Sequence, residues 1–134
     1  MKSLVDKIKL LEVAEAAAAC SYSPYSTVSV GAALLTKGGK IYTGVNIENA
    51  SYSPTVCAER VAFFKAISDG EREFSAIAIV GKVDFKLSKP FYPCGVCRQV
   101  MSEFCDGDFI ILVRSEDGYE EYTLSELLPK SFKL

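Results

Sequence analysis

The sequence predicts a three-layer α/β/α domain with a mixed five-stranded sheet. Strand-length apolar segments alternate with segments of helical periodicity along the chain, which is typical of an α/β layered domain. Two of the helical segments each lie between strands, so each is expected to join parallel strands. Turns containing glycine join the other strands as antiparallel neighbours. With no internal repeat or linker, residues 1–134 are expected to form one domain.

The first half of the chain is predicted to form a helix, a hairpin and a second helix. Apolar residues recur at helical spacing over residues 4–20, and Ser3 is a suitable N-cap. "TVSVGAALL" and "IYTGVNI" flank the turn "TKGGK", which predicts an antiparallel hairpin over residues 27–47. Pro54 suits the first position of the next helix, because its missing N–H would be unbonded there, and Gly70 suits its end.

The second half is predicted to contribute a strand, a helix and a second hairpin. "FSAIAIVGKV" is apolar and rich in β-branched residues, as expected for a strand covered on both faces. "KPFYPCGVCRQVMSEFC" begins as a loop and becomes helical at about Cys94. "DFIILVRS" is expected to be another buried strand, and the Asp-Gly turn in "EDGY" would fold "EEYTLS" back against it. The ending "SELLPKSF" is predicted to be a short helix and a tail.

The charge balance favours a small, uncharged ligand over a polyanion. The chain has 15 basic and 17 acidic residues and a net charge of -2. No run of Lys or Arg marks a nucleic-acid or membrane partner, so neither is expected. Charged residues interrupt "MKSLVDKIKLLEV", which argues against a signal peptide or a membrane span in this segment. The sequence therefore predicts a cytoplasmic protein.

The cysteines are predicted to be metal ligands or buried thiols, because five is an odd number and a reducing compartment disfavours disulfides. Cys94 and Cys97 form a C-x-x-C pair at one helix start, and Cys57 lies at another. A redox dithiol would use only the pair, whereas a metal site uses all three thiols, and three thiolates fill three of the four positions around zinc. Cys105 lies about 12 Å further along the helix and should not reach. Cys20 stays open as a fourth ligand.

Glu59 is the candidate proton carrier of this site. A carboxylate beside a zinc-activated water can take its proton and pass it to the substrate. Since residues two apart do not share a helix face, Cys57 and Glu59 can meet a ligand only beyond the end of their helix. Three thiolates leave a zinc site negatively charged. The N-termini of two helices, with Arg60 or Arg98 as hydrogen-bond donors to the sulfurs, are expected to offset that charge.

Two motifs, "CAER" and "PCGVCRQ", resemble the signature of the zinc-dependent cytidine deaminases, in the small homotetrameric class with three cysteine ligands. Four further segments resemble their counterparts in the same order, so the resemblance covers nearly the whole chain. They are "PYS" at 24–26, "VGAAL" at 30–34, "NIENASY" at 46–52 and "LLPKSF" at 127–132.

The resemblance implies a cytidine deaminase-like fold and the hydrolysis of cytidine and 2'-deoxycytidine, small-molecule nucleosides, to uridine and 2'-deoxyuridine in pyrimidine salvage. It implies one Zn²⁺ per subunit, bound by Cys57, Cys94 and Cys97. It also implies that Glu59 is the catalytic residue that moves the proton.

The resemblance further implies the residues that bind the substrate. Asn46, Ile47 and Glu48 would contact the ribose, and the backbone around Ala58 would bind the pyrimidine edge. The carboxylate of Glu48 would repel a phosphate, which favours free nucleosides. Asn46 and Glu48 could instead simply end a strand.

Two aromatic residues match family positions that reach into a neighbouring subunit. They are Tyr52 and Phe132, and they imply a homotetramer with sites shared between subunits. Phe132 could instead be a tail aromatic that covers the core.

One departure keeps a second enzyme activity open. The family usually has a phenylalanine just before the "VGAAL" strand, where this chain has Val28. A deaminase of another aminopyrimidine nucleoside, such as a nucleoside antibiotic, is therefore an alternative. A non-catalytic zinc module with Cys20 as fourth ligand is a third hypothesis, but it gives Glu59 no role.

Overall fold

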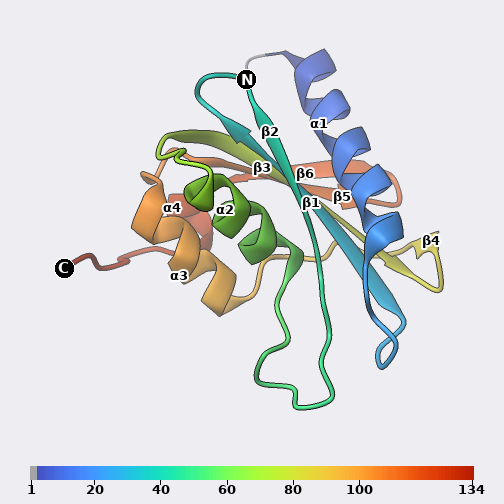
Figure 1. The fold of residues 1–134 in the computed structure, drawn as a ribbon. Coiled ribbons are helices and arrows are strands. Elements are labelled where there is room, and N and C mark those ends of the chain that lie inside the picture. Colours follow the sequence, from blue (N-terminus) through green and yellow to red (C-terminus); the bar gives the residue numbers. More distant parts are fainter. Residues whose placement is uncertain (1–2) are drawn as a thin grey trace.

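A mixed sheet forms the middle layer of the structure, which is a computed structural model that describes residues 3–134 (Figure 1). The strand order is β2-β1-β3-β5-β6, and a short strand, β4, pairs with the end of β3. Among the strands of the described residues, β3 and β5 are the one parallel pair, and the other neighbours are antiparallel. The strands are β1 (Val28–Thr36), β2 (Ile41–Val45), β3 (Phe74–Val83), β4 (Lys86–Leu87), β5 (Ile110–Ser115) and β6 (Gly118–Thr123).

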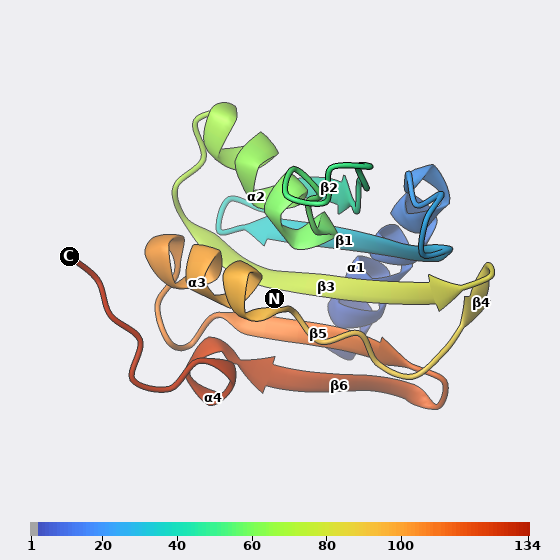
Figure 2. The same cartoon turned by 90° about the horizontal axis from the view of Figure 1, so that it is seen from below.

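Helices cover both faces of the sheet (Figures 1 and 2). On one face lies α1 (Leu4–Ala17), which a 3-10 turn, η1 (Ala18–Cys20), extends. On the other lie α2 (Ala58–Ser68) and α3 (Gly95–Phe104), with the short α4 (Leu124–Leu127) beside α3. None of the helices within residues 3–134 has both the length and the apolar character that a membrane span requires.

Two apolar clusters, one on each side of the sheet, hold the layers together. Phe63 of α2 and Met101 of α3 are fully buried against one face. Leu10 and Leu11 of α1 are buried against the other face. Fully burying side chains of this size stabilises the fold by about 1.5–3 kcal/mol each. The predicted α/β/α layering is thereby confirmed, with one correction, because β4 adds a sixth strand that is only two residues long.

The predicted start of the second helix at Pro54 is wrong. Val56 forms an antiparallel bridge with Ile47, with both N···O distances at 3.0 Å. Val56 is therefore extended, and the helix begins only after Cys57, which is its N-cap. Gly70 follows the helix with a positive φ of 99°, as predicted for its end.

The other boundaries follow local signals that the sequence contains. Ser3 caps α1, its hydroxyl accepting a hydrogen bond from Asp6 N at 3.1 Å. Cys94 is the N-cap of α3, where the sequence places the helix start. Thr123 and Glu126 form a capping box, so the last helix begins at Leu124.

The direction of the strands brings the starts of α2 and α3 together. Because β2 and β3 are each antiparallel to β1, they run parallel to each other, and α2 is the connection between them. The second connection, α3, joins β3 to its parallel neighbour β5. Residues 88–93 return across the sheet from β4 to the start of α3 (Figure 2). Parallel crossovers of this kind place ligand sites at the starts of the helices.

Gly44 lets the first turn of α2 lie directly on β2. A Cβ built at Gly44 would be 2.2 Å from the carbonyl oxygen of Ala58 and 2.6 Å from Ala62 N. Both atoms belong to the backbone, so a side chain at position 44 can be accommodated only by moving the helix. The position of Cys57 therefore depends on this glycine.

Gly44→Ala is expected to destabilise the protein by about 3 kcal/mol, because the methyl group forces α2 away from the sheet. Equilibrium urea unfolding measures the difference. Gly38→Ala is the matched control, since its Cβ would meet only Thr36 Oγ1 at 3.8 Å. Equal stability of the two variants would contradict the close approach of α2 to β2.

Candidate metal centre

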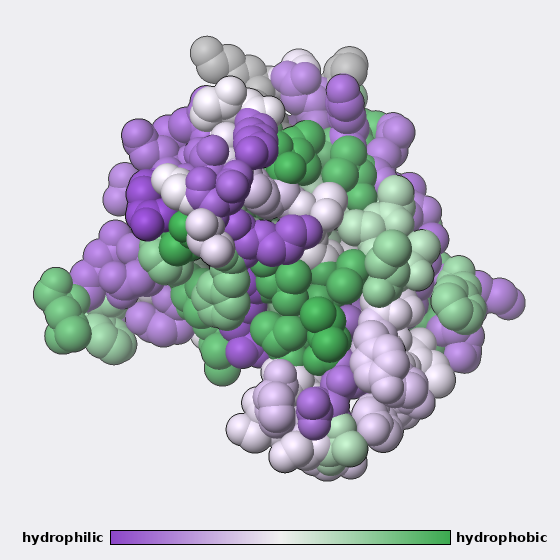
Figure 3. All heavy atoms as spheres, in the orientation of Figure 1, coloured by the Kyte–Doolittle hydropathy of each residue, from purple (hydrophilic) through white to green (hydrophobic). Residues whose placement is uncertain are grey.

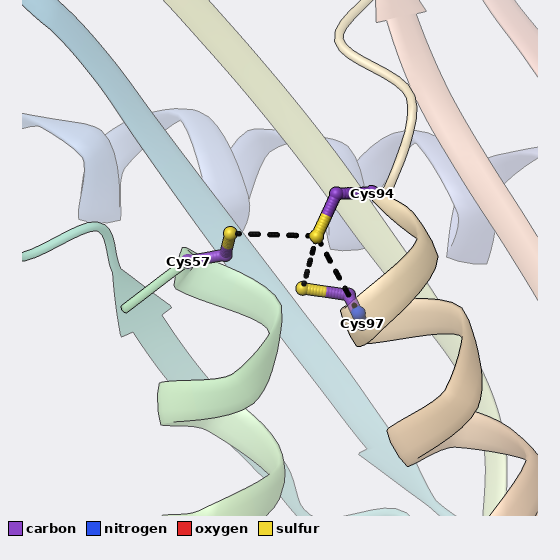
Figure 4. Close-up of side chains that lie close together, drawn as sticks. All are labelled: Cys57, Cys94 and Cys97. Atoms are coloured by element: carbon purple, nitrogen blue, oxygen red, sulfur yellow. Dashed lines mark hydrogen bonds between the residues drawn. The ribbon is translucent and has the colours of Figure 1, made fainter. Parts of the chain in front are cut away.

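Three cysteine sulfurs converge where α2 and α3 begin (Figure 4). Cys57 comes from the start of α2, and Cys94 and Cys97 come from the start of α3. The Sγ atoms of Cys57 and Cys94 are 3.8 Å apart, and those of Cys94 and Cys97 are 3.6 Å apart. All three sulfurs lie within 4.8 Å of one another.

This donor set fits a zinc ion. Sulfurs at three corners of a tetrahedron with zinc–sulfur bonds of about 2.3 Å are about 3.8 Å apart, which is close to the observed sulfur–sulfur distances of 3.8 and 3.6 Å. Cys20 and Cys105 do not join the cluster, which is the one such group among residues 3–134. The hypothesis of a site closed by Cys20 therefore finds no support, and the three ligands leave one position open.

Electrostatic interactions around the sulfurs favour a bound cation. A hydrogen bond from Cys97, together with one from Arg60, lowers the pKa of Cys57 to about 5. The pKa of Cys97 is raised, chiefly because its thiol proton bonds to Cys57 and secondly because the thiol is buried. A divalent cation bound by the three sulfurs displaces their remaining protons and stabilises all three as thiolates.

Helix termini and an arginine supply further positive charge to the cluster. Cys94 Sγ accepts a hydrogen bond from Cys97 N at 3.5 Å, in the first turn of α3. Arg60 Nη2 donates to Cys57 Sγ at 3.4 Å, as the sequence suggests, while its Nε is buried without a partner. Arg98 instead donates to two carbonyl oxygens, those of Pro93 at 2.7 Å and Leu127 at 2.8 Å. Arg98 therefore fixes the backbone before Cys94, whereas Arg60 contacts a sulfur.

Glu59 is a buried carboxyl group beside the cluster, with a relative exposure of 4%. Burial, the largest cause, raises the pKa of Glu59 to about 7, and the negative charge near Cys57 acts in the same direction. A group with this pKa exchanges protons readily at neutral pH.

A cavity of about 200 Å³ opens beside the cysteines, with Glu59 and Cys57 in its wall. Polar residues of the 46–59 segment line it, and apolar residues of the sheet and of the loop before α3 complete it. The lining residues are Val30, Asn46, Glu48, Thr55, Val56, Cys57, Ala58, Glu59, Ile79, Phe91, Tyr92 and Cys94. The volume suits a small molecule rather than a polymer.

Asn46 and Glu48 line this cavity and also bind neighbouring loops. The Asn46 amide accepts from Val30 N and donates to Val28 O, both at 2.9 Å. Glu48 accepts from Tyr25 N at 2.9 Å, and from the backbone N–H at 3.2 Å and the hydroxyl of Ser26. Each side chain keeps hydrogen-bonding capacity, since an amide has two N–H donors and a carboxylate has about four lone pairs.

The other five residues singled out from the sequence lie in different settings. Ala58 is fully buried and lines the cavity. Ile47 is 43% exposed and bridges Tyr22 and Val56. Tyr52 and Phe132 are 77% and 68% exposed and stand outside the cavity of their own chain. Val28 is also outside this lining, since the β1 residue that faces it is Val30.

Two aromatic residues of the cavity wall, Phe91 and Tyr92, are not predicted as site residues from the sequence. A Cβ at Gly81 would lie 2.0 Å from Cδ2 of Phe91, so the glycine makes room for this ring against β3. The available signal is the pair of aromatic residues directly before "PCGVC". Their contact with the cavity depends on how the loop returns over the sheet, which the sequence pattern does not specify.

The chain is similar to known deaminases over nearly its whole length. The family model described as "Cytidine and deoxycytidylate deaminase zinc-binding region" matches residues 5–113. A relative named cytidine deaminase, from Sporosarcina psychrophila, is 48% identical over 129 residues, which cover 96% of this chain and 92% of the relative. The crystal structure of cytidine deaminase from Burkholderia pseudomallei has a TM-score of 0.86 and 42% identity, covering 93% of this chain and 98% of that one. A blasticidin-S deaminase from Bacillus cereus is 34% identical over 108 residues, which are 77% of this chain and 76% of the relative.

Arg60→Met is expected to weaken zinc binding about 10- to 100-fold, because the sulfur of Cys57 loses its hydrogen-bond donor and the nearby positive charge. Competition with a chromophoric chelator measures the affinity. Arg72→Met is the control, because Arg72 lies beyond the far end of the same helix, where it donates to the carbonyls of Ile67 and Glu71. Unchanged zinc affinity in Arg60→Met would show that Arg60 does not stabilise the thiolates.

Proposed function

This chain belongs to the cytidine and deoxycytidylate deaminase family, and on that premise we propose that it hydrolyses cytidine and 2'-deoxycytidine. The products are uridine or 2'-deoxyuridine and ammonia. The proposal depends on one observation: the buried carboxyl of Glu59 lines one small cavity together with Cys57 and Cys94, two members of the three-cysteine cluster. Relatives named cytidine deaminase support it over nearly the full chain.

Cys57, Cys94 and Cys97 would hold one zinc ion per chain. Zinc bound at such a site acts as a Lewis acid that lowers the pKa of water, so that a nucleophile is available near neutral pH. The open fourth position is typical of catalytic rather than structural zinc sites. Side chains of this protein would carry out the other two tasks, proton transfer and substrate binding.

Glu59 meets the need for proton transfer. Hydrolysis removes both protons of the attacking water and adds one to N3 of the base and one to the departing amino group. Glu59 takes the first proton from the water and delivers it to N3. It then takes the second proton from the hydroxyl now on C4 and delivers it to the leaving amine, so that C4=O forms as the C–N bond breaks. Its pKa of about 7, raised mainly by burial, suits a group that must accept and donate within one turnover.

The polar end of the cavity would select nucleosides. Asn46 and Glu48 would bind the ribose hydroxyls with their remaining donors and acceptors, Ile47 would contribute its backbone, and the backbone at Ala58 would bind the pyrimidine edge. A hydrogen bond from Ser26 lowers the pKa of Glu48, so its carboxylate is charged at neutral pH. A negative charge at this end disfavours a phosphate group, which favours nucleosides over nucleotides.

We also propose that the enzyme is a cytoplasmic homotetramer in pyrimidine salvage, with sites shared between subunits. Tyr52 and Phe132 are exposed, and they would complete the site of a neighbouring subunit. Hydrophobic side chains gather on the face shown in Figure 3, and Phe64 of α2 and Val96 of α3 are 49% and 56% exposed. Apolar surface of this kind favours association between subunits.

A second activity on another aminopyrimidine nucleoside has one supporting observation. The blasticidin-S deaminase named above is similar to 77% of this chain. With Val28 outside the cavity lining, the wall has no aromatic side chain from the start of β1. Comparing turnover of cytidine and blasticidin S decides between the two activities.

Glu59→Gln is expected to lower kcat about 10³-fold while zinc stays bound, because the amide cannot carry the proton. The fall in ultraviolet absorbance of cytidine measures turnover, and metal analysis measures zinc. Glu103→Gln, an exposed carboxyl change on α3, should remain fully active. Wild-type activity in Glu59→Gln would exclude the proposed proton transfer.

Sedimentation of the wild-type protein at assay concentration is expected to give a tetramer. Phe132→Ala should then raise KM, because the ring would contact substrate in a neighbouring subunit. A monomer that deaminates cytidine with the full kcat/KM would remove Tyr52 and Phe132 from the site. Lys133→Ala, a change in the adjacent tail residue, serves as the control.

A further inference from the structure

Tyr92 connects the cavity wall to the far edge of the sheet. It lies two residues before Cys94, lines the cavity and is 48% exposed. The segment that carries it, residues 88–93, belongs to no helix or strand and crosses the sheet on its way to α3 (Figure 2). An aromatic side chain on an irregular segment needs contacts of its own to hold one position.

The hydroxyl of Tyr92 is tethered to Glu120 of β6. Tyr92 Oη donates to Glu120 Oε1 at 2.7 Å, and Tyr122 Oη donates to the same oxygen at 2.5 Å. The rings of Tyr92 and Tyr122 pack edge to face, with centroids 6.1 Å apart. A hydrogen bond to an ionised carboxylate is about twice as strong as one between neutral groups.

The register of β6 explains why the side chains of Glu120 and Tyr122 lie on the same face of the sheet as the cavity. Glu120 is opposite Val113 and Tyr122 is opposite Ile111, and both β5 residues pack in the core under α2 and α3. Side chains directly opposite in an antiparallel pair lie on the same face.

The residue between them faces the other way. Glu121 points to the α1 side, where its carboxylate pairs with Lys7 Nζ at 2.6 Å. Adjacent glutamates of one strand therefore have separate roles, and only Glu120 touches the cavity wall.

We propose that Glu120 is a positioning residue for substrate binding, which holds the ring of Tyr92 as a fixed wall of the cavity. This inference rests on the proposed function, because the substrate is taken to be a nucleoside with a flat base. Because the ring of Tyr92 is ordered before the substrate binds, binding does not cost the conformational entropy of ordering this side chain. Aromatic rings also attract one another in edge-to-face and offset arrangements. Glu120 should therefore affect KM more than kcat.

Glu120→Ala removes the acceptor from Tyr92. The KM for cytidine is expected to rise about tenfold, while kcat changes less than about twofold, because Glu59 and the cysteines are untouched. Glu120→Gln keeps an oxygen that accepts the phenol hydrogen, so it should stay within about threefold of the wild type. Tyr92→Phe should reproduce the effect of Glu120→Ala, and the double variant should lose no more than either single variant.

Glu121→Ala is the matched control, because it removes the neighbouring glutamate, which lies on the opposite face of the sheet. The KM of this variant should equal that of the wild type. Zinc content is measured for every variant. An unchanged KM in Glu120→Ala overturns the proposal. A joint loss of zinc and kcat also overturns it, because Glu120 would then be needed only for the integrity of the fold.

Hydrogen exchange of the zinc-loaded protein separates this proposal from the proposed function. The backbone amides of Phe91, Tyr92 and Cys94 should exchange faster in Glu120→Ala and at the wild-type rate in Glu120→Gln and Glu121→Ala. If the wild type leaves cytidine unchanged, the proposed function fails, and hydrogen exchange alone then tests whether Glu120 holds Tyr92 in place. Equal exchange rates in the wild type and in Glu120→Ala would overturn the proposal that Glu120 positions Tyr92.

Discussion

The starts of α2 and α3 converge on one point, and this convergence determines where the metal centre and the cavity lie. Three cysteine sulfurs within 4.8 Å of one another repel as thiolates unless a cation lies among them. The positive ends of α2 and α3 and the guanidinium of Arg60 reduce that repulsion. Zinc binding is therefore coupled to the correct packing of two helices that follow different strands.

The sheet makes this convergence possible. The order β2-β1-β3-β5 lets both crossover helices lie on one face. The bare backbone at Gly44 lets α2 approach β2 closely, and the bare backbone at Gly81 gives Phe91 its place against β3. The loop before α3 is fixed by side chains, because Arg98 binds the carbonyl of Pro93 and Glu120 binds Tyr92.

Local patterns in the sequence predict most elements and the metal ligands. Caps, turns and apolar periodicity act over a few residues, so the helix start at Cys94 and every strand except the two-residue β4 are found correctly. The start of α2 is misplaced, because the pairing of Val56 with Ile47 overrides the preference of Pro54. Tyr92 is missed because its partner Glu120 is 28 residues away, and such long-range side-chain contacts leave no periodic signal.

X-ray absorption at the zinc edge of the purified protein counts the sulfur atoms bound to the metal, and so tests whether Cys57, Cys94 and Cys97 bind one zinc ion together. The expected result is three sulfur ligands at about 2.3 Å and one oxygen or nitrogen ligand. Four sulfurs would mean a closed structural site, which requires a fourth cysteine beside Cys57, Cys94 and Cys97. Two sulfurs or none would contradict a three-cysteine site, because the starts of α2 and α3 would then not bind one metal ion together.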